Sequence, residues 1–111
     1  MWANIRLATI TLSLFVVIGF SPAARAWDGT PSGTITIIDV TTDSYSFRVN
    51  LTGAPAMCGN ANTWAYLSSA DPNYSAFAAA LLSAKAMGNA VVLYTTRDAS
   101  GYCHVGYVSL H

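Results

Sequence analysis

The chain has 111 residues, of which 53% are hydrophobic and 9% are charged, and five basic residues balance five acidic ones. This length allows one small domain. The balance of charge argues against nucleic acid as a partner, because binding to phosphates needs a basic surface, and equally against attachment to an anionic membrane.

The first 26 residues have the pattern of a cleaved secretory signal peptide. Arg6 gives a positive charge, an apolar run covers residues 7–20, and Ala24-Arg25-Ala26 presents small residues at a cleavage site. The run is shorter than the roughly 20 apolar residues of a membrane-spanning helix. We therefore expect cleavage near Ala26, a secreted or periplasmic location without membrane insertion, and one mature domain over residues 27–111.

Five segments have the composition or the alternating polarity of β-strands. They are residues 34–40, 44–51, 63–67, 90–96 and 102–110. With one helix between the third and fourth strands, the order is β-β-β-α-β-β. This order predicts a mainly β fold, a small five-stranded barrel like the OB-fold. An open antiparallel sheet with one helix on a face is the alternative.

Two of the expected strands have informative patterns. In residues 44–51 the apolar side chains alternate, which predicts that Tyr45, Phe47, Val49 and Leu51 share one face. In residues 34–40 the alternation slips at Ile37-Ile38, which indicates either a bulge or burial on both faces.

The expected helix has start and stop signals. Asp71 is a good N-cap, Pro72 suits the first helical position, and Gly88 suits the left-handed stop. One apolar stripe at helical spacing should cover the barrel. It consists of Tyr74, Phe77, Ala78, Leu81, Ala84 and Met87.

The opposite side of this helix is also apolar, with Ala79, Leu82 and Ala86. A helix that is apolar all round is normally buried all round, and a domain of this size has too little chain to surround it. We therefore expect this face to pack against other copies of the chain in a closed homo-oligomer. The alternative is an exposed alanine-rich face that needs no partner, because alanine is the best helix former.

Cys58 and Cys103 are the only cysteines. An exported protein folds in an oxidising compartment, so we expect them to form a disulfide. The closed loop would contribute about 3–4 kcal/mol on the chain-entropy model.

The sequence over about residues 27–110 resembles the pentameric B subunits of AB5-type bacterial toxins, most of all that of subtilase cytotoxin. The resemblance rests on Trp27, on "SGTITIIDV" and on "SSADPNYSAFAAALLSAKAMGNAVVLYTT". It implies an OB-fold, a ring of five subunits, binding to host or cell-surface glycans, and a possible catalytic A subunit as partner. A serine before the first strand is central to sialic-acid binding in that subunit, and Ser32 lies at this place, between Pro31 and Gly33, which depart from the family pattern. The family's disulfide joins early strands, which is a second departure.

The residues themselves favour binding over catalysis. His104 and His111 are the only histidines and lack the spacing of a zinc site, and no nucleophile motif accompanies them. We expect no enzyme activity and no cofactor. Trp27 and Trp64 are candidates for stacking on sugars. The alternative interpretation is packing at the rim of the barrel for Trp27 and packing in the core for Trp64. A glycan-binding subunit is thus the first hypothesis, and a structural or inhibitor-type domain that binds protein is the second.

Overall fold

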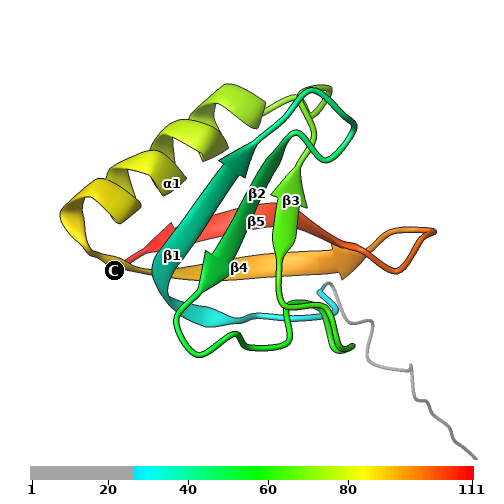
Figure 1. Cartoon of the computed structure of the whole chain (residues 1–111), viewed down its shortest axis with the longest axis horizontal. Helices are drawn as coiled ribbons and strands as arrows, with labels where there is room; N and C mark the ends of the chain where they lie inside the picture. Colours follow the sequence, from blue (N-terminus) through cyan, green and yellow to red (C-terminus); the bar gives the residue numbers. More distant parts are fainter. Residues whose placement is uncertain (1–26) are drawn as a thin grey trace, which may run out of the picture.

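A computed structural model describes residues 27–111, and the expected signal peptide lies outside the described residues. The elements in chain order are β1 (Ser32–Val40), β2 (Phe47–Leu51), β3 (Ala65–Leu67), α1 (Tyr74–Met87), β4 (Ala90–Arg97) and β5 (Cys103–Leu110) (Figure 1). A mainly β fold with one helix is thus confirmed.

The five strands pair into a closed ring in the order β1-β2-β3-β5-β4, which differs from their order along the chain. β3 and β5 run parallel, with Ala65 opposite Cys103, and the other pairs are antiparallel. Parallel neighbours need a long connection, which α1 and β4 provide. The open antiparallel sheet that the sequence also allowed is therefore not observed.

β1 pairs with its two neighbours in the ring through different parts of its length. Residues 32–34 pair with β4, and residues 35–40 pair with β2, with a shift of register between Ile35 and Ile37. This is the bulge that the slipped alternation indicated. Burial on both faces, the other possibility, is not observed, because Ile37 is 49% exposed. A bulge bends the strand and thereby turns it from one neighbour to the other.

The core fills the ring and the space beneath α1. It contains Ile35, Phe47, Val49, Leu51, Met57, Cys58, Ala65, Leu67, Leu81, Ala84, Val91, Leu93, Cys103 and Val105. Tyr74, Phe77 and Ala78 of α1 pack against it, as the apolar stripe predicted. Met87 does not, because it is 69% exposed at the last turn of α1.

The start of β2 differs from the expectation. Residues 43–46 form a turn in which the backbone N–H of Tyr45 donates to Asp43 (2.8 Å). The Tyr45 side chain therefore lies outside the ring, not on the inner face with Phe47. Ser46 is buried instead, and its hydroxyl accepts a hydrogen bond from the backbone of Ser69 (3.0 Å).

The start of α1 also differs, whereas its end is as expected. The N-cap is Asn73 rather than Asp71, and Pro72 precedes the helix. The Asp71 carboxylate instead accepts one hydrogen bond from the backbone N–H of Ser68 (2.9 Å), so it stabilises the turn before the helix. Gly88 ends α1 in the left-handed conformation, with φ 71°.

Cys58 and Cys103 form the expected disulfide, with their Cα atoms 5.5 Å apart. Both residues are completely buried. The bond joins the long β2–β3 loop to the first residue of β5, so it holds together segments that are 45 residues apart.

We expect the variant Cys58→Ala/Cys103→Ala to be less stable than the oxidised protein by about 3–4 kcal/mol, because the open chain has more conformational entropy when unfolded. Urea unfolding of the protein comprising residues 27–111 measures the difference. Wild-type protein in reducing buffer is the control and should unfold near the variant. Equal midpoints for oxidised and reduced protein would contradict the prediction.

Candidate functional site

Five aromatic side chains gather on the outer face of β2, β3 and β5. They are Tyr45, Trp64, Tyr66, Tyr102 and His104, and we call this group the aromatic face. It forms outside the ring because side chains alternate along a strand. Ala65, Leu67, Cys103 and Val105 point into the core, so the residues between them point outward.

Tyr45 lies at the centre of the aromatic face. Its ring meets that of Tyr66 edge to face at 4.7 Å between centroids, and that of Tyr102 at 5.0 Å. Trp64 lies 5.1 Å from Tyr102 and 6.0 Å from Tyr45. His104 stacks on Tyr66 at 5.0 Å. The edge-to-face contacts of Tyr45 with its neighbours hold these rings at fixed angles, so the aromatic face is rigid before a ligand binds.

Arg48 of β2 borders the face. Its guanidinium lies 5.2 Å from the ring centroid of Trp64, a cation–π arrangement. It donates to the carboxylate of Asp43 at 2.7 Å and to the backbone oxygen of Tyr45 at 3.1 Å. The β1–β2 turn and the rim of the face are thereby tied together.

Tyr66 and Asp98 form the polar contact beneath the face. The Tyr66 hydroxyl donates to the Asp98 carboxylate at 2.7 Å. Burial, and then this hydrogen bond to Asp98, raise the pKa of Tyr66 well above its usual value. Partial burial raises the pKa of Asp98, but the hydrogen bonds from Tyr66 and from the backbone at 100–102 outweigh it and lower that pKa overall.

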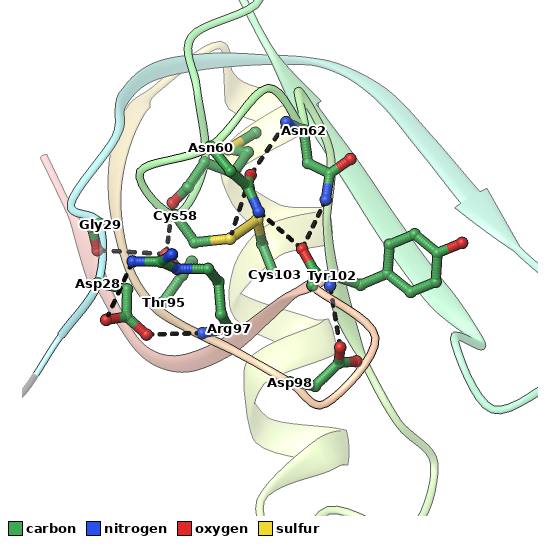
Figure 2. The surroundings of a disulfide bond; sticks show 12 residues. Asp28, Gly29, Cys58, Asn60, Asn62, Thr95, Arg97, Asp98, Tyr102 and Cys103 are labelled. Carbon is green, nitrogen blue, oxygen red and sulfur yellow. Dashed lines mark hydrogen bonds and ion pairs between the residues drawn. A yellow bond between two sulfur atoms is a disulfide. The ribbon is translucent and has the colours of Figure 1, made fainter.

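The loop that carries Tyr102 is held on both sides. Asp98 accepts the backbone N–H groups of Ser100 and Tyr102, each at 2.9 Å. The side-chain amides of Asn60 and Asn62 donate to the backbone oxygen of Gly101, at 2.8 and 2.7 Å (Figure 2). The β2–β3 loop and the β4–β5 loop thus form one rigid unit around the disulfide.

A pocket of about 170 Å³ lies beside the aromatic face, between β5 and the start of α1. Its lining residues are Asp71, Pro72, Asn73, Phe77, His104, Val105 and Gly106. His104 belongs to both features, since it stacks on Tyr66 and its Nε2 lies 2.8 Å from the Asp71 carboxylate. This contact also explains why the Asp71 side chain turns away from the helix terminus.

The three residues that the sequence nominated for glycan binding do not lie together. Trp64 is part of the aromatic face, whereas Trp27 packs against Tyr94 (5.8 Å) and Tyr107 (6.4 Å) outside β4 and β5. Ser32 is exposed and pairs with Val92, two residues from Tyr94, so it is on the side of Trp27.

Trp27 lies over Gly106, where a Cβ atom would come within 2.6 Å of the tryptophan ring. Only glycine fits beneath the ring without displacing it.

The helix face named by the sequence, Ala79, Leu82 and Ala86, is exposed in the single chain, with Leu82 at 50%. It lies opposite the side of α1 that buries Leu81 and Ala84.

Of the aromatic face, the sequence nominated only Trp64 for binding. It missed Tyr66, Tyr102, His104 and Tyr45, which it predicts on the inner face of a longer strand, and it missed the neighbouring Arg48 and Asp98. The available signal was the run "RDASGY", whose aspartate and glycine predict a tight turn that presents the following tyrosine.

Among residues 27–111, no group of three or more histidine, cysteine or acidic side chains is arranged to hold a metal ion. In the same part of the chain, no helix is both long and apolar enough to cross a membrane. Comparison with protein-family models, with curated proteins and with solved structures finds no match.

We expect Asp98→Asn to lower the free energy of unfolding by about 1 kcal/mol at pH 7, because a charged acceptor of several hydrogen bonds is lost. The lowered pKa of Asp98 means that its contribution exists above the ordinary aspartate pKa, about 4, and disappears as the pH falls further. The difference between variant and wild type should therefore shrink in acid. Urea unfolding between pH 3 and pH 7 measures it.

Asp39→Asn is the matched control, because Asp39 is exposed and its side-chain carboxylate accepts no hydrogen bond from the described residues. It should change stability little at either pH. An Asp98 effect that stays constant from pH 7 to pH 3 would contradict the assignment.

Proposed function

We propose that this chain is a secreted, non-catalytic carbohydrate-binding domain and that the aromatic face is its binding site. The observation that carries the proposal is the aromatic face itself, in which Tyr45, Trp64 and Tyr102 are partly exposed and rigidly held. Aromatic rings stack on the C–H faces of sugar rings, and polar side chains nearby fix the orientation. Arg48, Asn62 and Asp98 provide such polar groups.

The fold supports this location. We interpret the ring as an OB-fold, because five strands close with β3 parallel to β5 and the helix follows β3. Oligosaccharide and oligonucleotide ligands of OB-folds bind at strands 2 and 3 and at the loops after strands 1 and 4. Tyr45 and Tyr102 come from these two loops, and Trp64 directly precedes strand 3.

The charge favours sugar over nucleic acid. Residues 27–111 contain three basic residues, Arg48, Lys85 and Arg97, against five aspartates. Binding to a nucleic-acid strand depends on neutralising several phosphates, and only Arg48 borders the aromatic face. An oligonucleotide would thus meet more repulsion than attraction.

We propose further that the exposed face of α1 joins copies of the chain into a closed ring. The face is apolar and opposite the core, and single sugar sites are weak, so several sites on one assembly would raise the overall affinity. The number five and a possible catalytic A subunit come from the resemblance to AB5 toxins alone. The second candidate is a protein-binding domain, favoured by the exposed apolar side chains Ile37 and Val40 on β1.

Screening the mature protein on a glycan array tests the binding site. We expect Trp64→Ala and Tyr102→Ala to weaken binding at least tenfold, because each removes a stacking surface. Tyr107→Ala is the matched control, an exposed aromatic outside the face, and should bind as wild type does. Circular dichroism establishes that each variant is folded.

Ser32→Ala decides between the aromatic face and the site implied by the toxin resemblance. If Ser32→Ala loses binding while folded Trp64→Ala and Tyr102→Ala bind fully, the assignment of the glycan site to the aromatic face is overturned. Absence of binding to any glycan by wild type would favour the protein-binding candidate.

Light scattering with Leu82→Glu tests the assembly. We expect wild type to have several times the mass of one chain, and Leu82→Glu to be a folded monomer, because a buried charge opposes association. Thr42→Glu, in the exposed β1–β2 turn, is the control and should still assemble. A monomeric wild-type protein at micromolar concentration would contradict the ring.

A further inference from the structure

Carboxylates outnumber cations around the aromatic face. Asp43 lies beside Arg48, Asp98 beneath Tyr66, and Asp71 against His104. Asp39 is directly opposite Arg48 in the β1–β2 pair, and paired residues of neighbouring strands lie on the same side of a sheet. Four aspartates therefore border a face that has one arginine.

That arginine is already engaged. One Arg48 nitrogen lies 2.7 Å from Asp43, a second donates to the Tyr45 backbone, and the guanidinium plane lies near the Trp64 ring. Asp43 already compensates the positive charge of Arg48, so the attraction of Arg48 for an acidic ligand is reduced. Arg48 thus contributes packing and rigidity to the face more than it contributes free positive charge.

The other hydrogen-bonding groups at the aromatic face also favour a ligand that donates hydrogen bonds. The Tyr66 hydroxyl is taken up by Asp98, so it is not free to donate to an anion. The Asp98 carboxylate stays ionised at neutral pH, since hydrogen bonds lower its pKa. Ionised carboxylates only accept hydrogen bonds, and sugar hydroxyls are good donors.

Within residues 27–111, no second lysine or arginine lies near enough to compensate. Lys85 is exposed in the last turn of α1, at the opposite end of the helix from Asp71 and the aromatic face. Arg97 is directed to Asp28, on the other side of the disulfide from Tyr102 (Figure 2). The negative potential at the aromatic face is therefore offset by no lysine or arginine of residues 27–111 other than Arg48, and His104 of the face already contacts Asp71.

We propose that the aromatic face selects uncharged oligosaccharides and discriminates against sugars that carry a carboxylate or sulfate. This inference rests on the proposed function and names its ligand class. The selectivity arises from repulsion by Asp39, Asp43 and Asp98, and from the pairing of Arg48 with Asp43. Removal of Asp43 should weaken it, because one negative charge disappears and Arg48 is released.

The test compares matched ligands that differ only in charge. Neutral N-acetyllactosamine oligosaccharides and their sialylated and sulfated forms, with neutral gluco- and galacto-oligosaccharides, are presented on one array at low and high salt. We expect wild type to bind neutral forms at least tenfold more strongly than charged ones. The ratio should fall as salt increases, because salt screens charges near the surface.

Asp43→Asn should lower the ratio of neutral to charged binding at least threefold. The matched control is Asp28→Asn, which makes the same change of net charge and also releases an arginine, Arg97, but away from the face. It should leave the ratio unchanged. Trp64→Ala should lose both classes of ligand.

The outcomes separate the two proposals. Equal or stronger binding of sialylated or sulfated forms, lost in Trp64→Ala, would overturn the selectivity and leave glycan binding at this face intact. An unchanged ratio in Asp43→Asn would overturn the part assigned to Arg48 and Asp43. Failure of wild type to bind every sugar on the array would overturn the proposed function itself.

Discussion

The parallel pairing of β3 with β5, fastened by the Cys58–Cys103 disulfide, is the constraint on which the rest of the structure depends. The ring of strands would open without it, and because the two strands are parallel they cannot be joined by a short turn. Because β3 has only three residues, backbone pairing alone holds it weakly. The buried disulfide adds a covalent link at the end of this pair, where two long loops also meet.

The same constraint builds the aromatic face. Tyr66 lies in β3 and Trp64 directly before it. His104 lies in β5 and Tyr102 directly before it, and Tyr45 lies in the turn before β2. Asn60 and Asn62 then fix the backbone of Gly101, and Asp98 fixes Tyr66 and Tyr102. Rigid aromatic side chains lose little conformational entropy when a ligand binds, so a face held in this way suits weak, repeated contacts with sugars.

α1 has two different roles on its two sides. Leu81 and Ala84 seal the core, while Ala79, Leu82 and Ala86 remain exposed. A ring assembled through the exposed side would leave the aromatic face free, because that face belongs to β2, β3 and β5. Binding and assembly would then occupy separate surfaces of a very small domain, which is what gain of affinity through multiple sites requires.

Local patterns in the sequence determined the strands approximately, the extent of the helix to Gly88, the bulge in β1 and the pairing of the two cysteines. The strands, the helix end and the bulge follow from side-chain periodicity and backbone preference, which act over a few residues. The disulfide follows from the count of two cysteines together with the expectation of export. The tertiary structure decided the start of α1, the direction of Tyr45 and the composition of the site. Asp71 leaves the helix terminus because His104 lies 2.8 Å away, and Tyr45 meets Trp64 and Tyr102 because β3 pairs with β5. Such contacts join residues far apart in the chain, and no local preference contains them.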